Sequence, residues 1–454
     1  MKKRLTALAL AASMLLVLPG CGAKTPQVPS VMPNRAEVVK ANYPVQVQFP
    51  DAADYNDDWE KYNEQWELWW DDARQWRDGS VGNDIMAPFL TEAVPKLLTG
   101  TVGNEVCSPV NIYMALAMLS EITHGNTRAE LFQTLGVYSL EEMRENASKV
   151  WNTAYRNDGA VTSILASSVW LNEDVEFVKE TLDTLARTYY ASSYKGEMGS
   201  EDMNAAMRSW INEQTGGLLE EQAADLELSP ETILALATTV YFRAKWSQEF
   251  NPERTTQGEF DVLSPDGGTI PCEFMNSSGT NTYYWSDNFG AVSRRLENGG
   301  NMWFIRPDHE EGVSVAALLD DPTTMEFILA DGNWDNNKFL VVNFSVPKFD
   351  VAGEKDLVNP LRNLGIIDAF DQSAANFTPV TPTEGVFVSE VDHAARVSID
   401  EEGVTAAAYT VLPAAGAAMP PDEEIDFILD KPFLFAITSE SGLPLFVGVV
   451  QKPV

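Results

Sequence analysis

The clearest alternation of apolar and polar positions in this chain lies in residues 391–400. Its even positions carry mostly polar side chains, among them Asp392, Arg396 and Ser398, whereas its odd positions carry apolar side chains and one histidine. Successive side chains of a strand point to opposite faces, so this period of two predicts a strand that buries the odd set. The odd set consists of Val391, His393, Ala395, Val397 and Ile399.

Elsewhere, helical and strand-like stretches follow one another without a fixed repeat. Helical spacing of apolar residues predicts helices over 84–98, 109–121, 127–135, 176–190, 203–215 and 356–363. Runs rich in β-branched and aromatic residues predict strands over 162–171, 232–243, 339–347, 433–437 and 445–450. Strands and helices do not alternate regularly, which favours an α+β body built on a mixed or antiparallel sheet.

A separate helical pattern, acidic and rich in tryptophan, occupies residues 56–80. Its aromatic residues recur at intervals of three, four and seven, so they form one stripe of an amphipathic helix. This stripe either packs on the main body or forms a docking surface for a partner or for cell-wall material, since an exposed aromatic stripe of this size would otherwise be a liability. The stripe consists of Trp59, Tyr62, Trp66, Trp69, Trp70 and Trp76.

After the predicted strand at 391–400, two glutamates and a glycine are followed by a long uncharged stretch of mostly small residues. Residues 401–403 read Glu-Glu-Gly, and residues 404–421 are uncharged, rich in alanine and end in two prolines. This composition is typical of an exposed loop. The even positions are nevertheless all small or apolar, as is required of a segment that is to become a strand with one buried face. These positions are Val404, Ala406, Ala408, Thr410 and Leu412.

The first twenty residues have the pattern of an export signal. A basic start precedes an apolar stretch at 5–18, which is too short to span a bilayer comfortably. The ending Leu-Pro-Gly-Cys resembles a bacterial lipobox, which implies removal of residues 1–20 and lipidation of Cys21; an ordinary signal peptide is the alternative. We expect an exported protein, anchored by lipid at the cell surface or cell envelope or released extracellularly, with residues 21–55 as a flexible tether.

The charge balance excludes one class of partner. The chain has 67 acidic and 31 basic residues, a formal net charge of −36. Neutralising phosphates needs clustered Lys and Arg, so we expect no nucleic-acid partner. The carboxylates predict a solvated surface that keeps an exported protein soluble and monomeric.

The side chains that carry most catalysis are sparse. The histidines are His124, His309 and His393, and neither a Gly-x-Ser-x-Gly elbow nor a phosphate loop occurs. We therefore expect no enzyme, no cofactor and no metal. Beyond the lipobox, Cys107 and Cys272 are the remaining cysteines, and their spacing predicts two buried small residues rather than a metal site or a disulfide framework.

Six motifs follow one another in the order found in the serpins, and this resemblance covers residues 81–454. It implies the serpin fold: an α+β body with a large central mixed or antiparallel sheet, additional sheets, about eight or nine helices and an exposed reactive-centre loop, here about 401–426. The motifs are Cys107–Leu119 with Gly125–Glu130, Tyr241–Trp246 with Phe250 and Pro252, Val346–Phe349, Leu364–Phe370, Lys431–Phe435 and Pro444–Gly448.

The resemblance also implies a mechanism. A target serine protease attacks the loop as bait and forms an acyl-enzyme, after which the severed loop inserts into the central sheet and traps the protease covalently. The alternative is a non-inhibitory serpin that acts as a cell-surface binding module. Charged or bulky residues in the loop hinge are typical of that class, and this hinge has neither in its uncharged part.

The resemblance assigns roles to individual residues. Counting from Gly403 puts the reactive bond between Ala417 and Ala418. Small neighbouring side chains favour elastase-like or subtilisin-like proteases as partners and disfavour trypsin-like ones. The specificity residues are Ala414, Ala415, Gly416 and Met419. The hinge comprises Glu402, Gly403, Val404, Thr405, Ala406, Ala407 and Ala408. The shutter, a hydrogen-bonded cluster under the opening sheet, comprises Ser108, Asn111 and His393.

Overall fold

The structure is a computed structural model in which particular ranges of the chain are described. The predicted export signal, Cys21, and the hinge and specificity residues from Thr405 to Met419 lie outside them. The described ranges are 36–55, 58–78, 83–98, 103–262, 267–297, 300–309, 311–389, 391–404 and 421–453.

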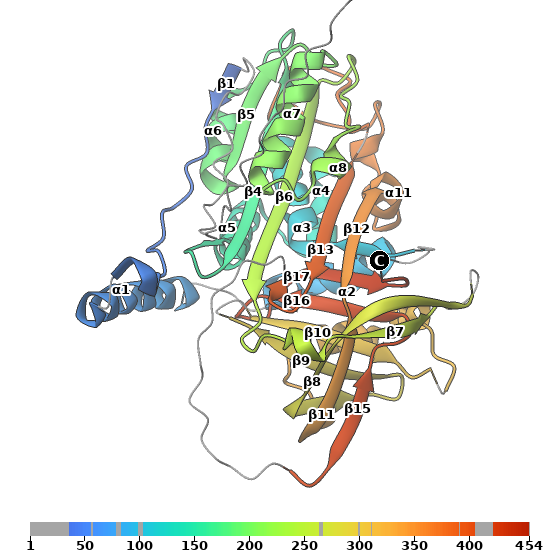
Figure 1. Ribbon diagram of the computed structural model, residues 1–454. Helices are drawn as coiled ribbons and strands as arrows, with labels where there is room; N and C mark the ends of the chain where they lie inside the picture. Colours follow the sequence, from blue (N-terminus) through green and yellow to red (C-terminus); the bar gives the residue numbers. More distant parts are fainter. Residues whose placement is uncertain are drawn as a thin grey trace, which may run out of the picture. The chain divides into compact units, whose positions relative to one another are not determined.

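A large sheet carries the beginning of the predicted loop (Figure 1). Its strand order is β1-β5-β4-β6-β14-β13-β12, and β3 pairs with β4 beside this path. The pairing of β4 with β5 is parallel and the others are antiparallel, so the sheet is mixed. The strands are β1 (Ala36–Val39), β3 (Arg156–Asn157), β4 (Thr162–Asn172), β5 (Ala191–Gly196), β6 (Leu234–Lys245), β12 (Phe349–Asp356), β13 (Asp392–Ile399) and β14 (Gly403–Val404).

A second mixed sheet has the order β15-β11-β8-β9-β10-β16-β17-β2, with β7 paired to β8. Its strands β16 and β17 are buried at every position, which explains why their sequences are apolar runs rather than alternations. The strands are β2 (Glu105–Cys107), β7 (Thr256–Asp261), β8 (Thr269–Trp285), β9 (Phe289–Leu296), β10 (Gly300–Pro307), β11 (Asn337–Pro347), β15 (Glu424–Ile428), β16 (Phe433–Thr438) and β17 (Pro444–Val450).

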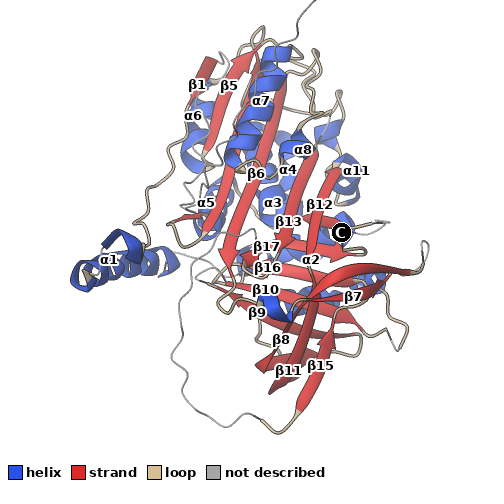
Figure 2. Ribbon diagram, in the orientation of Figure 1, coloured by secondary structure: helices blue, strands red, loops and turns tan. Residues whose placement is uncertain are grey.

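Eleven α-helices occur in the described ranges (Figure 2). They are α1 (Trp59–Asp78), α2 (Ala87–Leu98), α3 (Pro109–Ile122), α4 (Gly125–Leu135), α5 (Leu140–Ala154), α6 (Lys179–Thr188), α7 (Glu201–Gln214), α8 (Glu220–Ala223), α9 (Val315–Asp320), α10 (Pro322–Ala330) and α11 (Val358–Asn363). Four short 3-10 turns accompany them, at Ala52–Tyr55, Asn83–Ile85, Pro252–Arg254 and Asp368–Phe370.

Helices cover both faces of the first sheet. The face of β6 that carries Phe242 packs into the main core with α3, whereas its other face, at Ala237, packs with Trp210 of α7. Helix α3 is buried along nearly its whole length, and it begins where Ser108 caps it and Pro109 occupies its first turn. A central helix therefore supports the sheet directly beneath the strands that flank the predicted loop.

The predicted α+β class and fold are confirmed. The predicted strand at 391–400 is β13, and His393, Ala395, Val397 and Ile399 of its odd set are buried. Helix α5 was missed, although its buried residues recur at helical spacing. Strand β8 was missed because it is rich in Ser, Thr and Asn and half-exposed, so its long pairing with β11 decides its conformation.

The two cysteines differ in their surroundings. Cys107 is buried as predicted, but Cys272 is only partly buried, so the prediction for the second thiol was wrong. Cys272 belongs to the peripheral pair of strands β7 and β8, where the sheet is covered less. Both thiols are free. Burial raises the pKa of each of these thiols above its ordinary value, so neither is activated as a nucleophile.

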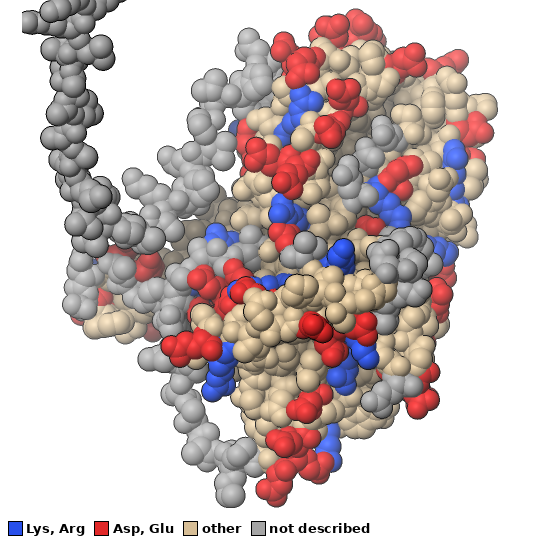
Figure 3. All heavy atoms as spheres, turned by 45° about the vertical axis from the view of Figure 1, so that its right-hand side comes forward, with Lys and Arg blue, Asp and Glu red and all other residues tan. Residues whose placement is uncertain are grey.

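Acidic side chains are spread over the face drawn in Figure 3, with basic side chains scattered among them. Within the described ranges, no cluster of three or more His, Cys, Asp or Glu side chains has an arrangement suited to a metal ion. No helix in those ranges has both the length and the apolar character needed to cross a bilayer.

Part of the predicted tether contacts the body. Strand β1 pairs with the edge strand β5, and the backbone N–H of Phe49 donates to the carbonyl of Asp158 at 2.6 Å. Tyr43 stacks against Trp151 with ring centroids 5.8 Å apart. The chain from residue 36 onward is thus held against one edge of the first sheet.

The tryptophan stripe on α1 divides into a packed part and an exposed part. Trp69 is 2% exposed, its indole N–H donates to the Asp158 carboxylate at 3.2 Å, and its ring meets Phe49 edge-on. Trp59 is 60% exposed. Packing on the body accounts for Trp69, and the docking alternative applies to the exposed end of the stripe.

We predict that Trp69→Ala releases α1 from the body. Replacing a buried tryptophan with alanine costs about 3 kcal/mol or more, which corresponds to roughly a hundredfold larger open population. Limited proteolysis followed by mass spectrometry should therefore show roughly hundredfold faster cleavage within residues 36–78. Trp59→Ala is the matched control and should leave the rate nearly unchanged; equal effects of the two substitutions would contradict this attachment.

Candidate functional site

The first residues of the predicted loop already lie in the large sheet. Gly403 is paired with Lys245, and Val404 is paired with Ala244 on one side and Ile399 on the other. Val404 is 1% exposed. Among the described residues, the other partner of β6 is β4 and that of β13 is β12, so β14 connects two strands that are otherwise not paired with each other.

Gly403 is required by a close approach of backbones. A Cβ atom at this position would lie 2.4 Å from the carbonyl oxygen of Ala244 and 2.8 Å from the Cα of Lys245. Neither atom belongs to a flexible side chain that could move aside. Any larger residue would push β14 away from β6, so β14 begins with the one residue that fits.

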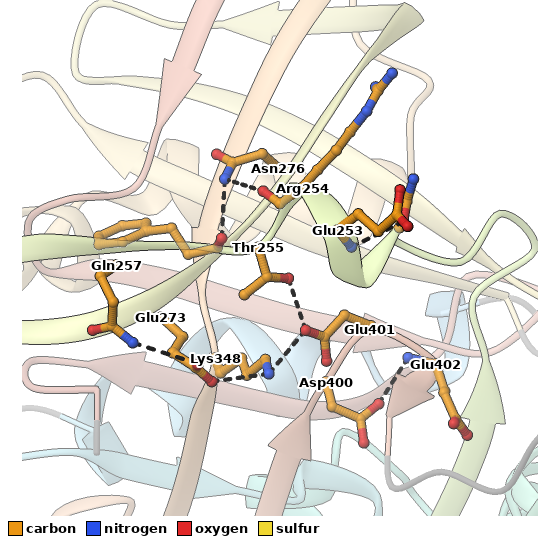
Figure 4. Close-up of polar contacts among 12 residues, drawn as sticks. Glu253, Arg254, Thr255, Gln257, Glu273, Asn276, Lys348, Asp400, Glu401 and Glu402 are labelled. Atoms are coloured by element: carbon orange, nitrogen blue, oxygen red, sulfur yellow. Dashed lines mark hydrogen bonds and ion pairs between the residues drawn. The ribbon is translucent and has the colours of Figure 1, made fainter.

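Asp400 organises the turn between β13 and β14. Its carboxylate accepts a hydrogen bond from the backbone N–H of Glu402 at 2.9 Å (Figure 4). It also accepts one from the backbone N–H of Gly403 at 3.1 Å. Its own N–H donates to the carbonyl of Gly403 at 3.1 Å. This arrangement is a side-chain-stabilised tight turn, for which aspartate is well suited.

A neighbouring segment, residues 246–250, grips the same turn, and we call it the clasp. The backbone N–H of Trp246 donates to the carbonyl of Glu402 at 3.0 Å, and the N–H of Phe250 donates to the carbonyl of Glu401 at 2.9 Å. The indole N–H of Trp246 donates to the carbonyl of Asp400 at 2.8 Å. Three successive carbonyls of the turn are therefore held by the clasp.

Glu401 connects the turn to both sheets. Its carboxylate lies 2.8 Å from the Lys348 ammonium and accepts a hydrogen bond from the Thr255 hydroxyl at 2.7 Å, and Lys348 also contacts Glu273 at 3.0 Å (Figure 4). Burial acts to raise the pKa of Glu401, but the hydrogen bonds from Lys348 and Thr255 outweigh burial and hold the pKa below its ordinary value. The carboxylate is therefore charged at neutral pH.

The structure brings the three predicted shutter residues together. The N–H of Ser108 donates to Nε2 of His393 at 3.1 Å, and the Ser108 hydroxyl accepts from the N–H of Asn111 at 3.4 Å. The Asn111 side-chain amide donates to the carbonyl of Thr238 at 3.1 Å. The start of α3 thus bonds to β13 through His393 and to β6 through Thr238, beneath the place where these two strands are not paired.

Two groups in this cluster have unusual states. Burial lowers the pKa of His393 to about 4, so the ring is neutral at pH 7, and because Nε2 accepts a hydrogen bond, the proton is on Nδ1. The Asn111 Oδ1 atom is buried and has no hydrogen-bond partner among the described residues. Such an acceptor is costly to leave unpaired and is suited to a donor that arrives later.

Sequence reasoning located part of this site. Glu402, Gly403 and Val404 of the predicted hinge lie at the turn, while the rest of the hinge and the reactive bond lie outside the described residues. Asp400, the Lys348–Glu401 ion pair and the backbone donors of the clasp were missed as functional groups. Trp246 and Phe250 were recognised as motif residues, but their spacing alone did not indicate that they hold the hinge.

Comparison with known proteins gives a consistent result. Residues 89–453 match the family model described as Serpin (serine protease inhibitor). The chain is 28% identical over 358 residues to the leukocyte elastase inhibitor of Homo sapiens, covering 77% of this chain and 93% of that protein. It is 27% identical over 379 residues to Serpin-Z2B of Triticum aestivum, covering 80% of this chain and 94% of that protein.

Two solved structures share the fold. The native state of tengpin, a thermophilic serpin, matches with a TM-score of 0.73 and 24% identity, covering 92% of this chain and 99% of that chain. The native stressed conformation of Arabidopsis AtSerpin1 matches with a TM-score of 0.70 and 24% identity, covering 82% of this chain and all of that chain. At these identities the likeness supports the fold.

We predict that His393 makes stability depend on pH. Because its pKa is about 4 in the folded protein and about 6.5 in an unfolded chain, the unfolded state binds the extra proton between these values. Stability should therefore fall as the pH is lowered from about 7 towards 4, with a contribution of roughly 3 kcal/mol. The measurement is urea unfolding of the wild type and His393→Gln at pH 7.5 and 4.5. The variant should lose this part of the pH dependence, and parallel pH dependences would contradict the assignment.

Proposed function

Because the chain belongs to the serpin family, a family of protease inhibitors rather than enzymes, we propose that it is a suicide-substrate inhibitor of elastase-like or subtilisin-like serine proteases. The observation that carries this proposal is the placement of Gly403 and Val404 as a two-residue strand between β6 and β13. A loop that starts inside the sheet needs only to continue along the same two strands.

The register of β14 predicts where each further loop residue would go. In antiparallel pairing, the residue number rises along one strand as it falls along its partner. Val404 is paired with Ala244 and Ile399, so two residues further on Ala406 would lie opposite Phe242 of β6 and Val397 of β13. The same continuation would put Thr410 opposite Thr238 and His393. The inserted strand would thus run from the turn at Asp400 to the shutter.

Small residues at the even positions suit this path. Val404, with its neighbours Ala244 and Ile399, faces the main core, and Phe242 and Val397 belong to the same core. Side chains of alternate residues share a face, so Ala406 and Ala408 would enter this core as well. A charged group there would be buried without a partner at a cost of several kcal/mol, which alanine avoids.

Thr410 fits the shutter. Its predicted neighbours Thr238 and His393 both belong to the hydrogen-bonded chain that runs through Asn111. The Asn111 Oδ1 atom has no hydrogen-bond partner among the described residues, and a threonine hydroxyl is a donor of suitable size. A hydrogen bond from Thr410 to Asn111 would stabilise the inserted state relative to the state before cleavage.

In the inserted strand, Pro413 would occupy a position where its missing N–H costs little. The same register would put Val411 opposite Asp392, the first residue of β13, and Pro413 opposite Ala235, close to the start of β6. At Pro413 the inserted strand has therefore passed the end of β13. A proline inside a strand removes a ladder hydrogen bond, and here one of the two neighbouring ladders is already over.

The chemical step belongs to the protease. Its serine Oγ would attack the carbonyl carbon of Ala417, the bond to the nitrogen of Ala418 would break, and the protease histidine would protonate the departing amine. Insertion would then distort the active site of the protease, so that it could no longer activate water to hydrolyse the acyl-enzyme. Alanine and glycine around the bond suit proteases with small or tolerant pockets, and the likeness to proteins named leukocyte elastase inhibitor supports this target class.

The alternative is a non-inhibitory serpin that acts as a cell-surface binding module. The fold and the hinge contacts described above are compatible with both functions. The two functions differ in whether the cleaved loop inserts before the acyl-enzyme is hydrolysed. The loop composition favours inhibition, because neither a charge nor a bulky side chain would enter the core at Ala406 or Ala408. The two functions predict different products when the protein meets a protease.

We predict that pancreatic elastase and the wild-type protein form a covalent complex stable in SDS, with a released C-terminal fragment that begins at Ala418. Ala406→Glu should raise the number of inhibitor molecules consumed per complex at least about tenfold, because a buried carboxylate opposes insertion. The measurements are gel electrophoresis, stoichiometric titration and N-terminal sequencing of the fragment.

Ala407→Glu is the matched control for this experiment. The register would put it opposite Arg396, on the other face of the sheet, so complex formation should change less than about twofold. Equal effects of the two substitutions would contradict the proposed register. If the wild type is merely cleaved at every protease dose, the inhibitory function is wrong and the binding-module alternative is favoured.

We further propose that Cys21 is lipidated after removal of residues 1–20, as in bacterial lipoproteins, and that the monomeric inhibitor acts at the cell surface. The support is the lipobox-like sequence and the preceding basic and apolar segments. A lipid-anchored inhibitor would protect the envelope from proteases that reach it.

We predict that Cys21→Ala moves the full-length protein out of the membrane fraction. The substitution removes the thiol that would carry the lipid, while leaving the folded body unchanged. The measurement is fractionation of cells that express either protein, followed by mass spectrometry of the mature N-terminus. Equal membrane association of the wild type and the variant, with an unmodified N-terminus, would contradict lipidation.

A further inference from the structure

Arg294 of β9 has an unusual environment for an arginine. Its guanidinium lies 4.0 Å from the centroid of the Phe250 ring and 5.8 Å from the centroids of both Trp246 and Phe344. It donates to the Ser277 hydroxyl at 3.0 Å and to the carbonyl of Gln248. Aromatic rings on several sides and a few polar contacts therefore hold this cation.

Arg294 has no carboxylate partner within salt-bridge distance among the described residues, and its Nε–H makes no hydrogen bond to them. Burial lowers the pKa of Arg294 to about 10, so the group stays charged at neutral pH. Arg294 is half-buried, and a cation that is partly withdrawn from water without a counter-ion has to be stabilised by other contacts.

The contacts of Arg294 converge on the clasp. Trp246 and Phe250 supply two of the rings, and the carbonyl of Gln248 between them accepts a hydrogen bond from the guanidinium. The backbone N–H groups of Trp246 and Phe250 are the donors that hold the carbonyls of Glu402 and Glu401. Arg294 thus contacts both ends and the middle of the segment that holds the hinge turn, and among the described residues its hydrogen bonds and ring contacts do not reach the turn itself.

Neighbouring backbone bonds support the clasp on its other side. Ser247 donates to the carbonyl of Arg295 at 2.9 Å, and Glu297 donates to the carbonyl of Lys245 at 2.8 Å. These bonds fix the start of the clasp to β9. These two bonds do not involve Phe250, at the far end of the clasp. The position of the Phe250 ring depends on its contacts with Arg294 and with the rings around it.

We propose that Arg294 is a positioning residue for protease inhibition. By stacking on Phe250 and Trp246 and bonding to Gln248, it fixes the clasp, and the clasp fixes the turn from which the loop enters the sheet. Because the clasp holds the turn in place, Val404 stays in register between β6 and β13. The loop residues that follow Val404 would then extend β14 rather than start a new strand. This inference rests on the proposed inhibitory function.

The consequence concerns the competition between insertion and hydrolysis. A loosened clasp would let the turn fluctuate, so the first new pairs after Val404 would form later and more acyl-enzyme would hydrolyse before it is trapped. We expect the rate at which the protease first attacks the loop to stay unchanged, because the contacts of Arg294 are with the clasp, Ser277 and Phe344. The expected signature is a higher stoichiometry of inhibition at an unchanged rate of loop cleavage.

The test compares the full-length wild type with Arg294→Met, which keeps an unbranched side chain of similar length and removes the charge and both hydrogen bonds. Amide hydrogen exchange at Trp246 and Phe250 should become about tenfold faster, as expected for the loss of a desolvated cation–π contact. With pancreatic elastase, the number of inhibitor molecules consumed per covalent complex should rise by about threefold or more.

Two further variants separate positioning from general stability. Arg294→Lys keeps the charge but loses the planar guanidinium that stacks on the rings, so it should give exchange and stoichiometry between those of the wild type and Arg294→Met. Arg362→Met removes a different ring-stacked arginine, which lies on α11 with its guanidinium 5.5 Å from the centroid of the Phe370 ring, and should leave both measurements unchanged. If Arg294→Met does not fold, Phe250→Leu replaces it, because it removes the ring nearest the guanidinium and should give the same two changes.

Several outcomes would overturn the inference. Unchanged exchange at both amides in a folded Arg294→Met protein would show that Arg294 does not hold the clasp. Faster exchange with unchanged stoichiometry would show that the clasp does not govern insertion. If the wild type forms no covalent complex, the proposed function fails and the role in inhibition fails with it. The exchange measurement still decides whether Arg294 holds the clasp, so the two failures are distinguishable.

Discussion

The pairing of Gly403 and Val404 between β6 and β13 is the interaction on which the rest of this structure depends. Two residues connect strands that the described part of the chain does not otherwise pair with each other, and the Asp400 turn, the clasp and the Glu401–Lys348 ion pair adjoin this junction. Backbone groups are obligatory hydrogen-bonding groups, so two facing strand edges favour a further strand between them. The uncharged segment that follows Val404 is the nearest candidate for that strand.

Two sets of contacts hold the junction from different directions. At the turn, the clasp bonds three carbonyls and Glu401 pairs with Lys348. Beneath the sheet, α3 links β13 to β6 through Ser108 and Asn111. In the proposed mechanism, the first set would fix where insertion begins, whereas the second would be rearranged or completed as insertion proceeds. A protein that traps its target kinetically needs both, because premature opening and slow opening each end inhibition.

Two ionisable groups of this region, the buried His393 and the half-buried Arg294, have no carboxylate partner among the described residues. His393 is neutral because burial lowers the pKa of its ring to about 4, so it can lie in the core without a counter-ion. Arg294 remains charged and is stabilised by aromatic rings instead. Both groups connect backbone elements near the junction, which explains why polar residues occupy positions that apolar ones could fill more cheaply.

Local pattern was sufficient for much of this protein. The period of two in β13 predicted its buried face, helical spacing predicted α2 to α4, α6 and α7, and the small even residues after Gly403 predicted a segment able to become a strand. These features depend on side chains close together in the sequence, which is why they are readable there. Strand β8 was not, because its polar residues carry no clear period until β11 pairs with it.

The sequence alone therefore determined the fold class, the family resemblance and the candidate hinge, whereas the tertiary structure decided which residues gather around that hinge. Glu401 and Lys348, or Arg294 and Phe250, are far apart or unrelated in the sequence, and nothing in their local pattern marks them as partners. Only folding brings β9, the clasp and the turn at Asp400 to one place. The physical reason is that periodicity reports which face a residue presents, while charge pairing and ring stacking depend on what that face meets.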